Sequence, residues 1–254
     1  MAGEPTLRDG DDGPFVVRLQ RALNSAGFDV GLADGLFRDR TRSQVRAFQS
    51  SEGLGVDGVV GADTWVELPT RVVRLHIKLM ALPTTETLGA MVREARRSFV
   101  SVGFGIEVAS VQTLPVNPVL IDLEVGTCPF PCATAPTTEQ TAMWVHDDHV
   151  AENEIRAYFV RSVLSLGTAL NGCCAHPPGQ PGVAVAQTAS QLSLGHEVGH
   201  VLGLSHVEPP GGPCQLERLM TGCGTNSVIN LPADLAAAEQ AIMESSPLAF
   251  RIDV

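Results

Sequence analysis

Residues 196–206 read His196-Glu197-Val198-Gly199-His200-Val201-Leu202-Gly203-Leu204-Ser205-His206. On a helix, His196 and His200 lie one turn apart on the same face, where two imidazoles can bind one small cation. His206 can join them only if the helix ends near Gly203, a residue that readily takes a positive φ. The stretch therefore predicts a three-histidine metal site with an open fourth position, as in catalytic zinc sites. Glu197, beside the first ligand, is placed to exchange a proton with a water molecule at that metal.

The alternative interpretation of this stretch is an apolar core helix that carries histidines by chance. Three histidines and a glutamate buried on such a helix would each need another polar partner. The additional Gly203 and His206 also make the full pattern more specific than a bare H-E-x-x-H. A metal site is therefore the favoured interpretation.

The pattern H-E-x-x-H-x-x-G-x-x-H resembles the zinc-binding motif of the metzincin metallopeptidases. That family has a Met-turn downstream, and Leu219-Met220-Thr221-Gly222 fits it, because Met220 follows His206 by fourteen residues. The resemblance implies a bound Zn²⁺ and Met220 as an apolar floor under the histidines. It also implies peptide hydrolysis, with Glu197 as the general base that takes a proton from water and later gives it to the leaving amine.

One position departs from the family. Some metzincins place a tyrosine ligand two residues after the Met-turn methionine, where this chain has Gly222, and the only tyrosine, Tyr158, lies far upstream. The resemblance implies that residues 71–254 form an α+β catalytic domain. Such a domain contains a twisted mixed sheet, long helices, the zinc helix, the Met-turn and a C-terminal helix.

The apolar periodicity of the second part of the chain agrees with this order of elements, since it opens with strand, long helix and strand. The predicted strands are 72–82, 106–111, 119–125, 155–163 and 183–187, and the predicted irregular segments are 126–149 and 171–179. The predicted helices begin at Thr84 or Thr85, at a cap on Ser190 or Ser193, and at Pro232, the last ending at Glu244.

The first part of the chain has the periodicity of short helices. Pro14 suits a first helical position, and Gly27 is typical of a helix end. Asp39 or Thr41 can cap a second helix, and a short third helix is predicted at residues 63–68.

Two turn signals, Asp34-Gly35 and Asp57-Gly58, each precede a predicted helix, so this segment consists of two similar halves. It resembles the three-helix peptidoglycan-binding domain. The matching residues are Leu19-Gln20, Leu23, Gly27, Asp34-Gly35, Phe37, Thr41, Phe48-Gln49, Leu54, Asp57-Gly58, Gly61 and Thr64-Trp65. Most are core and turn positions, which predict the fold better than the ligand. A docking or folding module that does not bind the cell wall is therefore the alternative interpretation.

We expect residues 1–68 to form this helical domain, joined to residues 71–254 by the short linker Pro69-Thr70. A related helical domain occurs in the pro-segments of matrix metalloproteinases, where a cysteine blocks the zinc. Residues 1–68 contain no cysteine, which excludes that mechanism of inhibition.

The composition is that of a globular protein. The chain has 254 residues, of which 44% are apolar and 18% charged, and its net charge is −11. Without a cluster of lysine or arginine, nucleic acid and anionic membrane are excluded as expected partners. No apolar run is long enough to span a membrane. We expect a monomer.

All six cysteines lie in the second part of the chain, and an even number in loops predicts disulfides and an oxidising compartment. The pairs that close short loops are Cys128–Cys132 and Cys214–Cys223. The adjacent Cys173 and Cys174 either pair with different partners or stay reduced, and free thiols or a second metal site are the alternatives for the whole set.

Other candidate positions are less specific. The run His146-Asp147-Asp148-His149 is either a second metal site, together with Glu152 or Glu154, or a solvated loop. His176 is expected at the rim of the zinc site rather than as a ligand. Residues 1–5 do not resemble a secretory signal, so we expect a removed signal, another export route such as a secretion machine, or an intracellular protein.

Together these features predict a zinc endopeptidase that acts on proteins or peptides, outside the cell or at the cell wall, with peptidoglycan as a possible ligand of the helical domain. The alternatives are a hydrolase of peptidoglycan peptides and a wall-binding protein without enzymatic activity.

Overall fold

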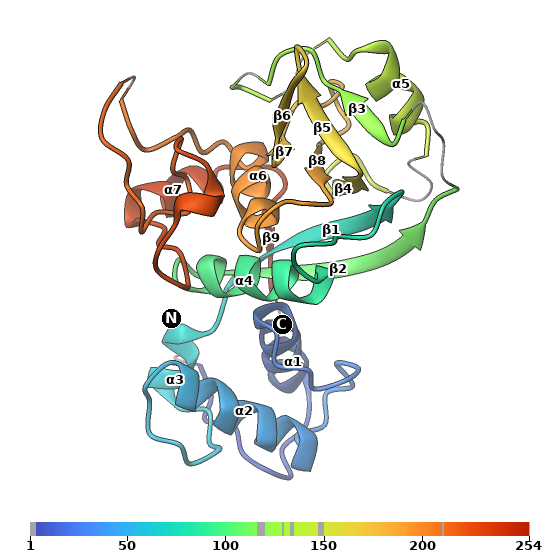
Figure 1. Cartoon of the computed structure of the whole chain (residues 1–254). Coiled ribbons are helices and arrows are strands. Elements are labelled where there is room, and N and C mark those ends of the chain that lie inside the picture. The colour runs from blue at the N-terminus through green and yellow to red at the C-terminus, as the bar shows by residue number, and fades with distance from the viewer. Residues whose placement is uncertain are drawn as a thin grey trace.

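The computed structural model describes residues 4–115, 120–128, 130–132, 135–146, 150–209 and 211–253. They form an α+β fold in which a helical part lies below a mixed sheet with its own helices (Figure 1). The helices are α1 (Pro14–Ala26), α2 (Asp39–Ser51), α3 (Ala62–Glu67), α4 (Leu88–Val100), α5 (Thr138–Trp144), α6 (Ser193–Val201), the 3₁₀ turn η1 (Thr225–Ser227) and α7 (Ala237–Glu244). The strands are β1 (Arg71–Leu79), β2 (Phe104–Thr113), β3 (Asp122–Glu124), β4 (Ile155–Val160), β5 (Ser162–Ser165), β6 (Thr168–Leu170), β7 (Gly172–Cys173), β8 (Gly182–Ala186) and β9 (Phe250–Arg251).

Helix α1 begins at Pro14 and ends at Gly27, whose φ of 98° is left-handed, as predicted. The predicted cap of α2 was wrong, because its N-cap is Arg38 and no side chain caps it. Asp39 instead bonds Arg42 at 2.7 Å, and the buried Thr41 hydroxyl faces Gln20. Both candidate caps therefore have other partners.

Two buried glutamines explain the repeat within the helical domain. Each side-chain amide nitrogen lies near an Asp carboxylate, a backbone carbonyl and a Thr hydroxyl, and each amide oxygen accepts the N–H of the turn glycine. For Gln20 these groups belong to Asp34, Leu36, Thr41 and Gly35. For Gln49 they belong to Asp57, Val59, Thr64 and Gly58. The repeated Asp-Gly turn and the helix that follows it are thus held by one glutamine in each half.

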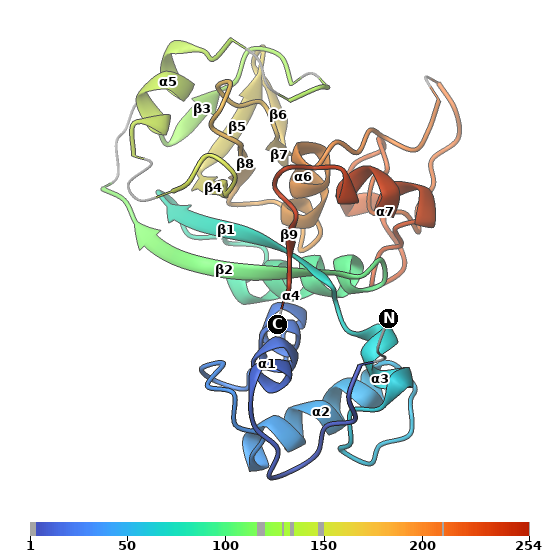
Figure 2. The same ribbon diagram turned by 180° about the vertical axis from the view of Figure 1, so that it is seen from behind.

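The helical domain packs directly on the rest of the chain. Val72 and Ile252 belong to the same apolar cluster as its core, and Ile252 N–H donates to the carbonyl of Thr70 at 2.9 Å. Gly105 of β2 faces Ser25 of α1 so closely that a Cβ would clash with it. Figure 2 shows α1 lying under α4 and β2, with the C-terminal end beside it.

The main sheet has the order β2-β1-β4-β8-β7, with β9 pairing antiparallel to β1. Strands β2, β1, β4 and β8 are parallel, and β7 is antiparallel at the edge. The alternating residues of β1 from Val73 to Leu79 pack with α4 and α6 in the largest core, as the alternation predicts. A smaller sheet of order β3-β5-β6 lies above it.

Several predicted boundaries were wrong for identifiable reasons. The first helix of this part begins at Leu88 rather than at Thr84 or Thr85, because Thr87 caps it by accepting Ala90 N–H at 3.1 Å. Residues 155–163 form two strands in different sheets, since Arg161 N–H donates to the carbonyl of Ile121, which directly precedes β3 of the smaller sheet.

Three further segments also differ from their predictions. The predicted irregular segment 126–149 contains α5, which a capping box of Thr137 and Gln140 begins. Residues 171–179, predicted as a loop, contain β7, and the last helix begins at 237 rather than 232. Among the described helices, none is both long and apolar enough to cross a membrane.

Candidate metal centre

The helix that carries the first two histidines is short and buried. Helix α6 ends at Val201, and Gly203 follows with φ 104°, which turns the chain as predicted. The predicted serine cap was wrong, because the N-cap is Leu192 and no side chain caps the helix. The hydroxyls of Ser190 and Ser193 instead each lie 2.8 Å from Thr225 Oγ1, which ties the start of the helix to η1.

The structure brings His196, His200 and His206 together, with their ligand atoms within 4.8 Å of one another. The Nε2 atom of His200 lies 3.1 Å from Nε2 of both other histidines. Tetrahedral zinc with Zn–N bonds of about 2.0–2.1 Å separates its nitrogen ligands by about 3.3–3.4 Å. The spacing of the three imidazoles therefore suits a zinc ion.

The hydrogen bonds at the far side of the rings test this fit independently. Nδ1 of His196 lies 2.7 Å from the carbonyl oxygen of Leu219, and Nδ1 of His200 lies 2.7 Å from that of Leu204. A carbonyl only accepts, so each Nδ1 carries the proton and each Nε2 presents a lone pair. Because neither Nε2 atom carries a proton, the two cannot form a hydrogen bond with each other. A cation between them would accept both lone pairs.

The charge state of the histidines agrees with metal binding, which requires neutral imidazole. Burial lowers the pKa of His196 to about 4 and that of His200 to about 3. Burial also lowers the pKa of the half-buried His206, against the opposing charge of Glu208. All three rings are therefore neutral at pH 7.

Met220 packs against helix α6, which carries His196 and His200. It is fully buried, and its Sδ would be only 2.6 Å from a Cβ at Gly199, so glycine is required at this position for the two segments to touch. A Cβ at Gly222 would lie 3.0 Å from Nδ1 of His206, which leaves little room for a side chain where some metzincins have tyrosine. Tyr158 is buried in a different apolar cluster and does not replace it.

Sequence reasoning missed Glu208, which connects the third histidine to the Met-turn. Its carboxylate accepts hydrogen bonds from Thr221 Oγ1 at 2.6 Å, Gly222 N–H at 2.7 Å and Gln215 N–H at 2.8 Å. Burial alone would raise its pKa, but these donors lower the pKa of Glu208 to about 2. The sequence feature that could have indicated this role is the position of an acidic residue two residues after His206.

Glu197 lies beside the histidines in a cleft of about 500 Å³. Burial raises the pKa of Glu197 to about 8, and a cation held by the histidines would lower it, so the carboxyl is suited to exchange a proton near neutral pH. Besides the histidines and Glu197, the walls include Phe130, Leu170, Asn171, Gly172, Thr221 and Thr225. Apart from Glu197 and the histidines, no ionisable side chain among the described residues lines this cleft.

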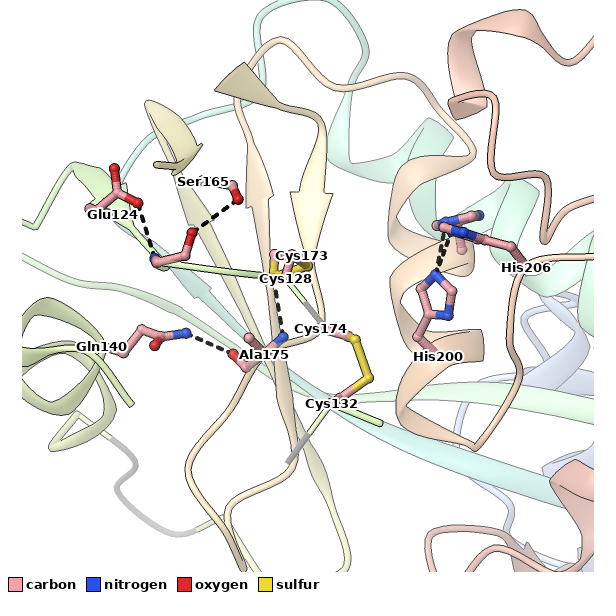
Figure 3. The surroundings of a disulfide bond; sticks show 12 residues. Glu124, Cys128, Cys132, Gln140, Ser165, Cys173, Cys174, Ala175, His200 and His206 are labelled. Carbon is pink, nitrogen blue, oxygen red and sulfur yellow. Dashed lines mark hydrogen bonds between the residues drawn. A yellow bond between two sulfur atoms is a disulfide. The ribbon is translucent and has the colours of Figure 1, made fainter. Parts of the chain in front are cut away.

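The disulfide prediction was correct for Cys214–Cys223 and wrong for Cys128–Cys132. The other bonds are Cys128–Cys173 and Cys132–Cys174. Cys173 and Cys174 lie at the end of edge strand β7, and each joins a different cysteine of the neighbouring segment (Figure 3). Phe130 lies in the sequence between Cys128 and Cys132, and its ring centre is 6.0 Å from that of His200. The two disulfides therefore fix the segment that carries Phe130, which lines the cleft. No described cysteine is free to bind a second metal.

The remaining candidates lie away from this cluster. His176 is buried, with Nδ1 2.9 Å from the Pro177 carbonyl, and does not line the cleft, so the prediction of a rim position was wrong. Residues 147–149 of the possible second metal site lie outside the described residues. Within the described ranges, the three histidines are the only group of His, Cys, Asp or Glu with the spacing of a metal site.

Comparison with known proteins identifies the helical part. Residues 12–68 match the family described as "Putative peptidoglycan binding domain". The match covers all three helices of the N-terminal segment. This segment is 41% identical over 66 residues to an uncharacterized protein of Kitasatospora aureofaciens, covering 26% of this chain and 56% of that protein. It is also 41% identical over 58 residues to a spore cortex-lytic enzyme of Bacillus cereus, covering 23% and 22% of the two chains.

The chain thus spans 56% and 22% of the lengths of these relatives. Among solved structures, archaemetzincin of Methanopyrus kandleri matches 68% of this chain and 93% of its own with 12% identity and a TM-score of 0.42, a level that carries no argument for fold or activity. The peptidoglycan-binding domain and the disulfides both fit an extracellular or cell-wall location.

Proposed function

We propose that the chain is a zinc-dependent endopeptidase whose N-terminal domain directs it to the cell wall. The observation that carries this proposal is the convergence of three neutral imidazoles beside a buried Glu197 in an open cleft. The motif spacing and the Met220 floor under Gly199 support it. Residues 71–254 are the proposed catalytic domain and residues 1–68 the proposed targeting domain.

In this proposal, His196, His200 and His206 would hold Zn²⁺ through their Nε2 atoms. When bound, the ion supplies Lewis acidity and lowers the pKa of a water molecule towards about 7. The Glu197 carboxylate takes the proton of that water and later donates it to the leaving amine. Because Gly222 has no hydroxyl, backbone donors would have to stabilise the substrate oxygen, and a bound ion would add its charge to that stabilisation.

The replacement Glu197→Ala tests this assignment. It removes the proton carrier but no ligand, so zinc content and fold should be unchanged while casein cleavage falls by about 10²–10⁴-fold. Glu67→Ala, an exposed residue of α3, is the matched control and should cleave normally. Near-normal turnover in Glu197→Ala would refute the mechanism.

The targeting role depends on the helical domain. Residues 1–68 contain seven arginines against eleven acidic residues, so simple attraction to an anionic wall does not explain binding. A shaped groove with hydrogen bonds and apolar contacts is required. The full chain carrying Glu197→Ala, which cannot digest the wall, should sediment with insoluble peptidoglycan. A chain that stays in the supernatant would refute targeting by this domain.

The domain match favours a second candidate, a hydrolase of peptidoglycan peptides. The two functions share the site and differ in substrate. Digestion of purified wall and of casein by the same preparation separates them, because an endopeptidase of proteins releases casein fragments and leaves wall peptides intact. A chain that binds wall and cleaves neither substrate would instead be a non-enzymatic wall-binding protein.

A further inference from the structure

A cavity of about 690 Å³ lies between the helical domain and α4, separate from the histidine cleft. One wall is the stripe of α4 that contains Leu88, Val92 and Arg96, which are one helical turn apart. The opposite wall is formed by the segment after α1, including Phe28, and the end of α2. Figures 1 and 2 both show α4 above the end of α1, with α6 on its other side.

The lining of the cavity is largely apolar, but its charged groups are mainly positive. The ionisable residues that line it are Arg93, Arg96, Arg97 and Glu52, in a chain with a net charge of −11. Apolar walls with a few polar groups are typical of small-molecule sites, and a volume of about 300–1,000 Å³ is usual for them. This cavity has both properties and an excess of positive charge.

The three arginines differ in their partners. Arg93 and Arg97 both bond the buried carboxylate of Glu94, at 3.2 and 3.4 Å. Arg96 uses only Nε, which donates to the Ile106 carbonyl at 2.9 Å. Among the described residues, neither terminal nitrogen of Arg96 has a hydrogen-bond or ion-pair partner.

The side chain of Arg96 is partly buried. Its Cδ would lie 3.3 Å from a Cβ at Gly27, so the side chain runs against the end of α1. Burial lowers the pKa of the Arg96 guanidinium, because partial removal from water disfavours its charge. A half-buried cation with unused donors is stabilised by an anion that accepts both of them, as a carboxylate does.

We propose that this interdomain cavity binds a small amphipathic carboxylate, with Arg96 pairing the carboxylate and the apolar walls covering an aliphatic body. A free aliphatic acid and the carboxylate end of an apolar peptide offer the same chemistry. The site is independent of the histidine cleft and does not require the proposed enzymatic activity.

Isothermal titration calorimetry of the full chain tests the proposal, with sodium octanoate below its micelle concentration as the probe. Octanoate should bind saturably at one site, and 1-octanol at least tenfold more weakly because it lacks the charge. N-acetyl-leucine is the peptide-type carboxylate, and the tighter of the two acids identifies the source of the ligand.

Two variants locate the site. Arg96→Gln should weaken octanoate binding at least tenfold, whereas Arg21→Gln, an exposed residue of α1 outside the cavity, should leave it unchanged. Gly89→Leu places a side chain at the cavity wall, where a Cβ has Thr87 Oγ1 as its nearest neighbour at 4.0 Å. It should keep the fold, since leucine favours a helix more than glycine, and should also weaken binding tenfold.

Circular dichroism of both variants confirms that they are folded. The proposal is overturned if neither carboxylate binds saturably to the wild-type chain. It is equally overturned if 1-octanol binds as well as octanoate, or if folded Arg96→Gln and Gly89→Leu bind as the wild type does.

Discussion

Glu197 lies against the backbone of Gly172 in edge strand β7. A Cβ at residue 172 would be 2.7 Å from Glu197 Cγ, 2.9 Å from its Oε1 and 2.9 Å from the carbonyl oxygen of Ala184. The backbone oxygen on one side and the carboxylate on the other leave no space for a methyl group. The strand that continues into Cys173 and Cys174 thus fixes the position of the proposed proton carrier.

Gly172→Ala should therefore displace Glu197 while leaving the three histidines in place. We expect casein cleavage to fall by at least tenfold, because a displaced general base loses its geometry with the reacting atoms. Zinc content should stay at the wild-type level. Gly55→Ala, where a Cβ would have no neighbour within 4 Å, is the control. Full activity in Gly172→Ala would mean that the contact does not position Glu197.

The second prediction concerns the glutamine repeat of the helical domain. Gln49→Leu leaves the buried N–H of Gly58 and the Asp57 carboxylate without this partner. The free energy of unfolding in urea should fall by about 1–3 kcal/mol, the cost of unsatisfied buried polar groups. The same exchange at Gln240, which bonds Glu244 at the surface, should have little effect. Equal effects at both positions would contradict the role of the buried amide.

The disulfide Cys214–Cys223 encloses Met220 and should stabilise the Met-turn. The double replacement Cys214→Ser with Cys223→Ser should lower the free energy of unfolding by about 2–3 kcal/mol, as expected for a short closed loop. It should also speed the loss of zinc to a chelator. Peptide mass mapping without reductant should find the three bonds of the structure. A linked Cys128–Cys132 peptide would contradict this pairing.

The fourth prediction concerns pH. Hydrogen bonds from Arg161 and then Ser162 lower the pKa of Asp122 to about 2, from its usual value of 3.8. Because the pKa of Asp122 is lower in the folded chain than in the unfolded chain, its ionised carboxylate stabilises the fold. This stabilisation is complete above the unfolded pKa of 3.8 and is lost as the pH falls from 3.8 towards about 2. The difference in stability between the wild type and Asp122→Asn should therefore shrink over this range. A difference that does not change with pH would contradict the ion pair.

The features that could be predicted from the sequence are those set by local geometry. The histidine spacing and Gly203 predicted the end of the helix, and the Asp-Gly turns predicted the repeat, because each depends on residues a few positions apart. Boundaries such as the cap at Thr87 were missed, since several threonines in one segment offer equivalent caps.

The features that could not be predicted depend on which distant segments lie side by side. Cys128 pairs with Cys173 because β7 runs beside the segment that contains Cys128, and nothing local to either cysteine encodes that arrangement. The bonds of Glu208 to the Met-turn and the cavity beside Arg96 arise in the same way, from contacts between elements that are separate in the sequence.

The zinc content of the purified full chain is the decisive test of the three-histidine metal site. Plasma mass spectrometry should find one zinc per chain in the wild type and in His146→Ala, whose side chain lies outside the histidine cluster. His200→Ala should lose stoichiometric zinc, because His200 Nε2 lies 3.1 Å from both other ligand atoms. A wild-type chain that does not bind stoichiometric zinc, or a His200→Ala chain that retains all of it, would rule out the proposed zinc site.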